Sequence, residues 1–382
     1  MHNTDSILNK NVSFTKPDGQ LAEQLESGEN LRVKFGIDPT GPRIHLGRAA
    51  TLMKLREFQD AGHQIVLIVG DFTTLVGDAS DKTKERPMLS RDDVAKNLEN
   101  YLALLGKIID IEKCEIKYNS EWLGRLDFND IGQLANQFSV AEMLDRENFS
   151  KRFKEGVRIS LREFLYPMMQ GYDSVAVRSD VELGGNDQLF NMLAGRTLQK
   201  HFGKKPQSII GTNLLNAANG EKMSTSQGNC IWIDDEPNEM FGAIMTMRDS
   251  EMISYFEALT QIDLTKARKM IARDPRDAKL SLARDIVSTF HDENTADIAK
   301  DAWIAQFSES QKPAEMQEIE IKSESMLSDI LIETNFIESR GEFRRLLEQG
   351  GIKIDGEKIS KDQPLQKNQE VQIGKRKWVR GV

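Results

Sequence analysis

Leu31-Arg-Val-Lys-Phe-Gly-Ile37 followed by Asp38-Pro-Thr-Gly-Pro-Arg-Ile-His-Leu-Gly-Arg48 is the stretch that decides the fold of this 382-residue chain. The first part has the apolar pattern of a strand, and an amphipathic helix pattern runs from Leu46 to Ala61. Thr40, His45 and Arg48 therefore lie around the predicted N-terminus of a helix. Free backbone N–H groups and the helix dipole favour bound phosphate at such a position.

A second apolar run, Ile65-Val-Leu-Ile-Val69, is typical of a strand buried on both faces in a parallel sheet. With a helix stop at Gly62, residues 31–69 have the order strand, phosphate loop, helix and strand, which is a βαβ crossover. We therefore predict an α/β fold with a Rossmann-like doubly wound parallel sheet. Further short strands are predicted at Val175–Val177, Val181–Leu183 and Ser208–Ile210.

Between residues 235 and 320 the strand signals vanish and helical spacing replaces them. The helical stretches are Met240–Met247, Glu251–Leu259, Leu264–Ala272, Ala278–Phe290 and Glu293–Phe307. We therefore predict three domains: a Rossmann-like catalytic domain with an N-terminal extension at 1–220, a polar loop and α-helical domain at 221–320, and a small α+β domain at 321–382.

The C-terminal region has its own pattern. An amphipathic helix begins near Met326, a second helix follows the capping hydroxyl of Ser339, and a turn, a strand and an Asp-Gly hairpin turn occupy 350–358. Its basic residues include Arg340, Arg344, Arg345 and Lys353. A small packing module without a ligand is one interpretation, but an arginine-bearing helix beside a basic hairpin favours contact with an RNA phosphate backbone.

Composition limits the class of protein. Hydrophobic residues make up 39% and charged residues 29%, and no apolar run approaches the roughly 18 residues that a membrane helix needs. The N-terminus lacks the pattern of an export signal, and Cys114 and Cys230 form no CxxC pair. We expect a cytoplasmic protein with no membrane partner, no disulfide and no metal site of its own.

The net charge of −9 is unevenly distributed. Residues 322–382 carry 12 Lys and Arg against 10 Asp and Glu, so the rest of the chain is the acidic part. An acidic body argues against indiscriminate binding of nucleic acid, whereas a weakly basic tail suits a protein that touches RNA in a few places. An ordinary solvated surface explains the tail bias equally well.

A polar segment flanked by glycines, Gly220-Glu-Lys-Met-Ser-Thr-Ser-Gln-Gly228, places a lysine and hydroxyl groups far along the chain from the first motif. Lys222, Ser224 and Ser226 are suited to closing on phosphates after a nucleotide binds. Alone the segment would be an ordinary surface loop. Together with the stretch at 38–48, it indicates chemistry on a nucleoside triphosphate.

One predicted helix carries three polar residues on an otherwise apolar sequence. Tyr166, Gln170 and Asp173 are spaced i, i+4 and i+7, so they share one helix face. A buried polar face needs partners, and a bound polar ligand would supply them. A solvated stripe is the alternative, although lysine and glutamate would be more typical of it.

Two further polar groups follow predicted strands. Gly184-Gly-Asn-Asp-Gln188 comes after the strand Val181–Leu183, and such a glycine pair lets a ribose approach while Asp187 accepts its hydroxyls. Gly70-Asp71 and the segment from Gly77 to Arg86, which includes Asp78 and Lys82, lie beyond Val69. Ligands of open α/β sheets bind at this carboxyl edge.

In combination, the segments at 38–48 and 222–226 resemble the "HIGH" and "KMSKS" motifs of the class I aminoacyl-tRNA synthetases. With the helix face at 166–173 and the turn at 184–188, nearly the whole chain is similar to the bacterial-type tyrosyl-tRNA synthetase family. The C-terminal region resembles the S4 RNA-binding domain, and its four basic residues named above are the expected RNA contacts.

The resemblance implies how L-tyrosine is bound. Tyr166 and Gln170 hold the substrate ammonium, and Asp173 meets the phenolic hydroxyl. Asp78 falls where the family has a further carboxylate near the ammonium, and Gln188 matches a residue near the reacting carboxyl end.

The resemblance also implies an ATP site. Thr40 and His45 match donors on the pyrophosphate side, Thr51 matches a nucleotide contact, and Asp187 with Gly185 matches the ribose contact. Gly36 and Gly47 would let the nucleotide approach the backbone closely. The other expected ATP-binding and catalytic residues are Asp38, Arg48, Lys82, Arg86, Lys222, Met223, Ser224, Thr225 and Ser226.

Three positions depart from the family pattern. Arg48 stands where the family usually has His, and Thr225 stands where it usually has Lys. We hypothesise that Arg48 partly replaces the positive charge missing at position 225. Lys34 occupies a position where some members have a Tyr that reaches the substrate phenol, which leaves open how a second phenol hydrogen bond is made.

These observations predict a two-step enzyme that joins tyrosine to ATP and then transfers the tyrosyl group to the 3′ end of tRNA(Tyr). The resemblance implies ATP as a substrate, Mg²⁺ carried with ATP and a homodimer. Tryptophanyl-tRNA synthetase is the nearest alternative, which the polar triplet at 166, 170 and 173 and the S4-like region disfavour. A non-catalytic RNA-binding relative is the second, suggested by Arg48 and Thr225.

Overall fold

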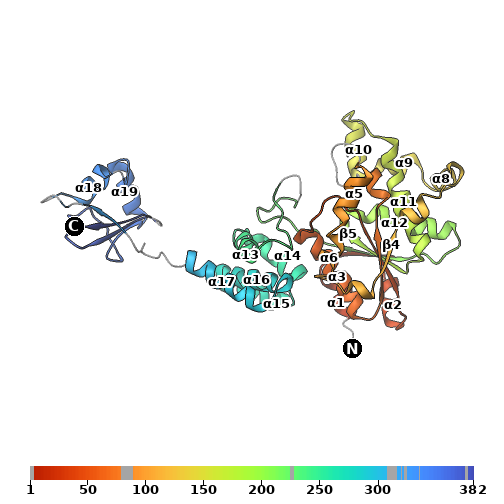
Figure 1. Cartoon of the computed structure of the whole chain (residues 1–382), viewed down its shortest axis with the longest axis horizontal. Helices are drawn as coiled ribbons and strands as arrows, with labels where there is room; N and C mark the ends of the chain where they lie inside the picture. Colours follow the sequence, from red (N-terminus) through yellow and green to blue (C-terminus); the bar gives the residue numbers. More distant parts are fainter. Residues whose placement is uncertain are drawn as a thin grey trace. The chain divides into compact units, whose positions relative to one another are not determined.

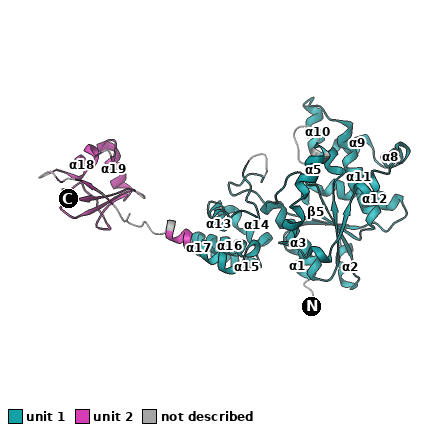
Figure 2. Ribbon diagram, in the orientation of Figure 1, with its two compact units in different colours: residues 1–300 teal, residues 301–382 magenta. Residues whose placement is uncertain are grey.

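A computed structural model describes residues 4–78, 89–223, 228–307, 316–319, 321, 325–334, 336–374 and 377–382. The chain divides into two compact units, residues 1–300 and residues 301–382, which are coloured separately in Figure 2. Each unit has its own sheet and its own buried core. None of the helices in the described ranges has the length and apolar character that a membrane span requires.

The first unit is built on a six-stranded sheet with the order β1-β6-β5-β2-β3-β4. All neighbours pair in parallel except β1, which joins β6 antiparallel at one edge. The strands are β1 (Val12–Lys16), β2 (Arg32–Ile37), β3 (Gln64–Val69), β4 (Glu115–Tyr118), β5 (Val181–Gly185) and β6 (Ser208–Thr212). The order reverses at β2, so the predicted doubly wound parallel sheet is confirmed.

The predicted βαβ unit forms as expected. β2 is followed by α3 (Leu46–Asp60) and then by β3, whose residues from Ile65 onward are all buried. Because β3 lies inside the sheet with helices on its faces, every position along it can be apolar (Figure 1). The other helices before residue 202 are α1 (Thr4–Asn9), α2 (Gln20–Glu26), α4 (Thr73–Val76), α5 (Arg91–Leu98), α6 (Tyr101–Leu105), α7 (Ser120–Leu123), α8 (Phe128–Ala135), α9 (Val140–Asp145), α10 (Glu147–Lys154), α11 (Leu161–Val177) and α12 (Leu189–His201).

One predicted strand is wrong. Val175–Val177 is the last turn of α11, a helix that begins with a capping box between Ser160 and Glu163. Val177 is buried against Val66 and Ile68, so the apolar alternation reflects packing of the helix end on the sheet. A left-handed residue, Arg178 with φ 52°, ends the helix and leads into β5. The edge strands β1 and β4 are part of the sheet that the sequence pattern did not predict.

The region after β6 is helical, as predicted. It comprises α13 (Pro237–Met245), α14 (Met252–Leu259), α15 (Leu264–Arg273), α16 (Pro275–Phe290) and α17 (Glu293–Phe307). Proline at the first position of α13 and α16 fits a helix start, because the missing N–H has no partner there anyway. Buried apolar residues such as Phe241, Tyr255 and Ile286 give this region its core.

In the described residues from 316 onward, the second unit has a five-stranded sheet with the order β7-β11-β10-β8-β9 and the helices α18 and α19. Its elements are β7 (Gln317–Ile319), α18 (Leu327–Glu333), α19 (Arg340–Glu348), β8 (Ile352–Ile354), β9 (Glu357–Lys358), β10 (Glu370–Ile373) and β11 (Lys377–Gly381). Ser339 caps α19 by accepting the N–H of Glu342. Asp355 and Gly356 have φ values of 47° and 87°, which confirms the predicted hairpin turn between β8 and β9.

A buried ion pair joins α10 to α11. Arg152 Nη1 lies 2.5 Å from Glu163 Oε2, and both side chains are 1% exposed. Replacing Arg152 with Met leaves the Glu163 carboxylate buried without its cation. We expect the free energy of unfolding, measured in urea, to fall by about 3–5 kcal/mol. Arg56→Met, which breaks an exposed ion pair with Asp60, is the control and should cost less than about 1 kcal/mol. Equal losses in the two variants would contradict this account.

Candidate active site

The crevice for a ligand forms where two central strands separate. Within the described strands, β2 and β5 pair only at Val33–Val181 and Lys34–Glu182. Beyond these rungs, β2 pairs with β3 alone and β5 pairs with β6 alone. The carboxyl ends of β2 and β5 therefore diverge at the point where the strand order reverses, which is where α/β sheets bind ligands.

His45 is the residue that caps α3 at the phosphate-binding end. Its Nδ1 accepts the backbone N–H of Arg48 at 3.3 Å. Burial, and secondarily the Arg48 charge, lower the pKa of His45 to about 4. The ring is therefore neutral at pH 7, and because Nδ1 is an acceptor its proton is on Nε2. Between pH 4 and the unfolded value near 6.5, only the unfolded chain gains this proton, so the contribution of His45 to stability is lost as the pH falls.

Arg48 is a partly buried cation in the first turn of α3. Its Nη1 donates to the Tyr101 hydroxyl at 2.6 Å, and its Nη2 donates to Thr40 Oγ1 at 3.2 Å. A longer contact of 3.5 Å reaches the Asp38 carbonyl oxygen. Because Thr40 Oγ1 already accepts from Arg48, its own proton is directed to another acceptor. Arg48 thus orients Thr40.

Asp38, at the end of β2, joins the phosphate side of the site to α11. Its Oδ2 accepts from the Tyr166 hydroxyl at 2.9 Å, and its Oδ1 accepts from Thr73 Oγ1 at 2.8 Å. A Cβ at Gly70 would lie 2.0 Å from Asp38 Oδ1, so only glycine fits there. Burial, and secondarily the Asp38 charge, raise the pKa of Tyr166, which keeps its phenol protonated and able to donate.

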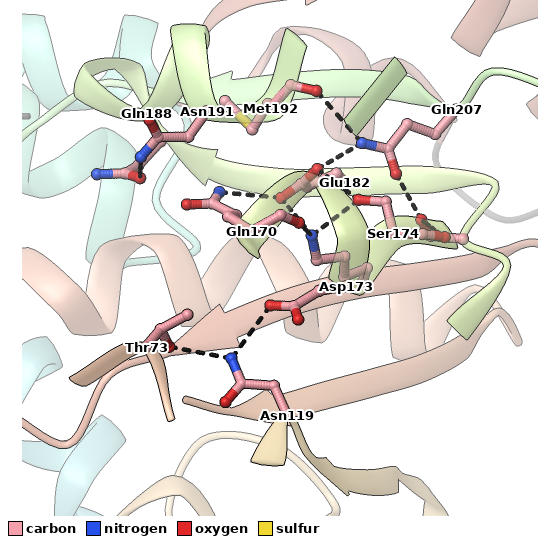
Figure 3. Close-up of polar contacts among 12 residues, drawn as sticks. Thr73, Asn119, Gln170, Asp173, Ser174, Glu182, Gln188, Asn191, Met192 and Gln207 are labelled. Atoms are coloured by element: carbon pink, nitrogen blue, oxygen red, sulfur yellow. Dashed lines mark hydrogen bonds and ion pairs between the residues drawn. The ribbon is translucent and has the colours of Figure 1, made fainter. Parts of the chain in front are cut away.

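Asp173 lies one helical turn below Gln170 on α11 and is 4% exposed. Trp122 Nε1 donates to its Oδ1 at 2.8 Å. Asn119 Nδ2 donates to its Oδ2 at 3.3 Å, as Figure 3 shows. Burial raises the pKa of Asp173 to about 7, against the opposing effects of Lys34, Trp122 and Asn119. The site thus contains a buried carboxyl group that gains by accepting a further hydrogen bond.

The opposite wall of the crevice follows β5. Gln188 Nε2 donates to Asp78 Oδ2 at 2.8 Å, and Asn191 Nδ2 donates to Gln188 Oε1 at 2.9 Å. A Cβ at Gly185 would lie 2.7 Å from Asp187 Oδ1, so Gly185 allows the close approach of this carboxylate. These contacts bring together Asp78 and Gln188, which are far apart in the sequence.

Among the described residues of the second polar segment, Met223 contacts the first segment. Met223 is 5% exposed, and its Sδ accepts the backbone N–H of Gly47 at 3.4 Å. Asn229 Nδ2 donates to the Lys222 carbonyl oxygen at 3.1 Å. The chain on both sides of this segment therefore lies at the N-terminus of α3. The predicted residues Lys82, Arg86, Ser224, Thr225 and Ser226 are outside the described part of the chain.

Two predicted ATP-binding residues need separate comment. Thr51 is 6% exposed, and its hydroxyl lies 2.9 Å from that of Thr212 on β6. Its hydroxyl therefore links α3 to the end of β6. Gly36 has no atom within 4 Å of a hypothetical Cβ, so its neighbourhood is open.

Several polar residues of the site were not predicted from the sequence. Thr73 and Asn119 form the chain of hydrogen bonds between Asp38 and Asp173, and Trp122 donates separately to Asp173. Asn119 follows the short edge strand β4, which has no strong sequence pattern, so the only available signal was a polar residue after a strand. Among the described residues, no three His, Cys, Asp or Glu side chains are grouped to hold a metal ion.

The basic residues of the second unit differ in their surroundings. Arg340 donates to Asp329 at 2.6 Å, so its charge is partly neutralised. Arg344 and Arg345 on α19 are exposed. Lys353 on β8 lies directly opposite Lys358 on β9. Two like charges at one rung repel, and an anionic partner would relieve that repulsion.

Comparisons with known proteins place the chain. Residues 26–308 match the family tRNA synthetases class I (W and Y), and residues 327–371 match the S4 domain. The tyrosine–tRNA ligase of Thermotoga maritima is 42% identical over 384 residues, covering 98% of this chain and 96% of the relative. That of Mannheimia succiniciproducens is 44% identical over 381 residues, with the same coverage. The chain therefore belongs to this family of class I tRNA synthetases.

A solved structure supports the fold. The tyrosyl-tRNA synthetase of Archaeoglobus fulgidus, complexed with L-tyrosine, superposes with a TM-score of 0.63 and 18% sequence identity. The match covers 77% of this chain and 98% of that protein. At this identity the likeness concerns the fold alone. The resemblance inferred from the two motifs and the predicted fold class are both confirmed.

The pKa of Asp173 has a consequence for stability. An unfolded aspartate titrates near pH 3.9, whereas the folded side chain titrates at about 7. Between these values the folded chain holds the proton and the unfolded chain does not, so raising the pH destabilises the fold. In the wild type, the free energy of unfolding should therefore fall as the pH rises from 4.5 to 7.5. Asp173→Asn has no carboxyl group at this position, so we expect the fall to be smaller by on the order of 2 kcal/mol.

Urea unfolding followed by tryptophan fluorescence measures this effect, because Trp122 contacts Asp173 directly. Asp60→Asn, at a side chain that is 62% exposed, is the matched control and should leave the pH dependence unchanged. Parallel pH profiles for wild type and Asp173→Asn would show that the carboxyl group does not titrate in this range.

Proposed function

We infer that this chain is a tyrosine–tRNA ligase, an aminoacyl-tRNA synthetase that activates L-tyrosine with ATP and then charges tRNA(Tyr). The observation that carries the substrate assignment is Asp173, a buried carboxyl group fixed by Trp122 and Asn119 at the end of a polar helix face. The full-length relatives named tyrosine–tRNA ligase support the same activity.

In the first step, a carboxylate oxygen of tyrosine attacks the α-phosphorus of ATP. A new P–O bond forms to the tyrosine, and the bond to pyrophosphate breaks, giving tyrosyl-adenylate. The carboxylate is already ionised, so the enzyme supplies position and charge stabilisation. We assign the Nε2 proton of His45 and the hydroxyl proton of Thr40 to the departing pyrophosphate, with Lys222 approaching from the second segment.

In the second step, a ribose hydroxyl at the 3′ end of the tRNA attacks the carbonyl carbon of the adenylate. The tyrosyl ester forms, and AMP leaves with the electron pair of the broken C–O bond. The Arg344 and Arg345 side chains on α19 suit contact with RNA phosphates, as does the Lys353–Lys358 rung. We propose that the S4-like unit holds the tRNA in this way.

The amino-acid site follows from the same geometry. We assign Asp173 to the phenolic hydroxyl and Tyr166, Gln170 and Asp78 to the ammonium group, with Gln188 near the reacting carboxylate. Phenylalanine would leave Asp173 with an unmet hydrogen bond, and sites that bond a substrate hydroxyl reject such analogues by roughly 10⁴–10⁵. Tryptophan lacks the hydroxyl as well, which disfavours the tryptophanyl alternative.

The remaining assignments rest on the family. We propose that Asp187 and Gly185 meet the ribose of ATP, that Mg²⁺ arrives with ATP, and that functional boundaries lie near residues 220 and 320. Neither Cys114 nor Cys230 is in a disulfide, which suits a reducing compartment, and we propose the cytoplasm.

Tyrosine-dependent ATP–pyrophosphate exchange tests the activity. We expect exchange with tyrosine and at least 10³-fold less with phenylalanine or tryptophan, because Asp173 selects the hydroxyl. Asp173→Ala should lose most of the tyrosine activity and of the preference over phenylalanine. Asp297→Ala, which removes an exposed carboxylate in the helical region, should behave as wild type. Exchange that depended on tryptophan, or none with any amino acid, would refute the assignment.

We also propose that the chain works as a homodimer. The segment between β4 and α11 exposes large apolar side chains: Phe128 at 92%, Val140 at 65%, Phe153 at 65% and Leu161 at 80%. Exposed apolar groups concentrated in one segment of the chain are typical of a protein interface. A second copy of the chain is the partner that the family resemblance implies.

Sedimentation velocity measures the oligomeric state directly. We expect wild type to sediment as a dimer and Phe128→Asp combined with Leu161→Asp to sediment as a monomer, since a buried unpaired carboxylate opposes association. Ile298→Asp is the control, because Ile298 is 58% exposed but lies on α17. A monomeric wild type, or a dimer unaffected by the two charges, would contradict the proposal.

A further inference from the structure

A buried ion pair forms the floor of the amino-acid site. Lys34 on β2 and Glu182 on β5 are partners in the rung after which the two strands separate. Their side chains are 0% and 2% exposed, and Lys34 Nζ lies 2.8 Å from Glu182 Oε1. Lys34 Nζ also donates to the Gln170 backbone, so the pair lies against α11. Figure 3 shows Glu182 beside Gln170 and Ser174 of that helix.

Lys34 does not donate a hydrogen bond to the phenolic hydroxyl of the substrate. Its ammonium group has three protons, and these are donated to the backbone carbonyl oxygen of Gln170, to Ser174 Oγ and to Glu182 Oε1, each at 2.8 Å. With all three protons engaged, none is left for a substrate hydroxyl. Lys34 therefore holds Glu182 and the neighbouring groups of α11 in place.

Glu182 fixes the orientation of the Gln170 side-chain amide. Its Oε1 accepts from Gln170 Nε2 at 3.0 Å, while its Oε2 accepts from Ser174 Oγ at 3.2 Å and from Gln207 Nε2. An ionised carboxylate can only accept hydrogen bonds, so it selects the amide orientation that presents NH₂. The side-chain carbonyl oxygen of Gln170, Oε1, must then point away from the Lys34–Glu182 pair.

That carbonyl oxygen is available to a ligand. Gln170 is only partly buried, and no donor in the described part of the chain meets its Oε1. Tyr166 lies one turn away on the same helix face and directs its proton to Asp38. A substrate ammonium between these groups would therefore find the Gln170 carbonyl oxygen as an acceptor already turned toward it.

We propose that Glu182, kept in place by Lys34, is a positioning residue that holds the Gln170 amide with its oxygen toward the ammonium group of the amino acid. This inference rests on the proposed function and extends it to a pair that does not touch substrate. A neutral amide at position 182 would both donate and accept, so it would accept either orientation of Gln170. Lys34 supplies the opposite charge to Glu182 at 2.8 Å, so the buried pair has no net charge.

The binding of two small ligands distinguishes a role of Glu182 in positioning Gln170 from a role in packing alone. Tyramine carries the phenol and the ammonium group, whereas 3-(4-hydroxyphenyl)propanoate carries the phenol and a carboxylate but no ammonium group. We expect Glu182→Gln to weaken tyramine binding at least tenfold, measured by equilibrium dialysis, and to change propanoate binding less than twofold. In pyrophosphate exchange, the KM for tyrosine should rise about as much, with kcat and the KM for ATP near wild type.

Lys34→Met combined with Glu182→Met tests the inference if Glu182→Gln does not fold, because apolar replacement of a buried ion pair is often neutral for stability. It should show the same selective loss for tyramine. Gln170→Leu should do so too, and adding Glu182→Gln to it should cause no further loss, since one residue acts through the other. Glu163→Gln is the matched control: it breaks the buried ion pair between α10 and α11, so it should lower stability and leave the tyramine-to-propanoate ratio unchanged.

Equal losses for both ligands in the Glu182 variants, or additive losses with Gln170→Leu, would overturn this inference while leaving the proposed function intact. A wild-type chain that bound neither ligand and showed no tyrosine-dependent exchange would overturn the proposed function, and this inference with it.

Discussion

The separation of β2 and β5 is the constraint on which the site depends. These strands share two rungs and then diverge, each continuing with its other neighbour. The last shared rung is Lys34 with Glu182, so an ion pair closes the sheet where the crevice opens. Apolar side chains at this rung would close the sheet equally well, but they would offer α11 no acceptor for the Gln170 amide.

A continuous chain of hydrogen bonds runs above this floor. It leads from Tyr166 through Asp38, Thr73 and Asn119 to Asp173, and each member fixes the next. Buried polar groups are costly unless they are paired, so a network with most of its partners in place defines one conformation. The network leaves only a few oriented atoms for a ligand to contact. Such a site can discriminate between similar amino acids.

The phosphate side is organised by a helix terminus. His45 is neutral because partial burial and the Arg48 charge lower its pKa, and capping α3 with Nδ1 leaves its Nε2 proton for a ligand. Arg48 is directed to Thr40 and Tyr101, so its charge acts from behind the hydroxyl donor. We hypothesised that Arg48 partly replaces the positive charge missing at position 225. Its described contacts indicate that it does so indirectly, by orienting Thr40. Met223 joins the second segment to the same helix start through Gly47.

The sequence by itself determined the sheet class, the βαβ unit, the helical region and the hairpin turn at Asp355-Gly356, because each depends on local periodicity or on turn chemistry. It also identified Tyr166, Gln170 and Asp173 as one helix face, because helical spacing is a local property. Only the tertiary structure decided that Val175–Val177 ends a helix, since alternating apolar residues fit either a strand or a packed helix end. The partners Trp122, Asn119 and Glu182 were likewise decided in three dimensions: strands distant in sequence bring them to one point, and no local pattern encodes that meeting.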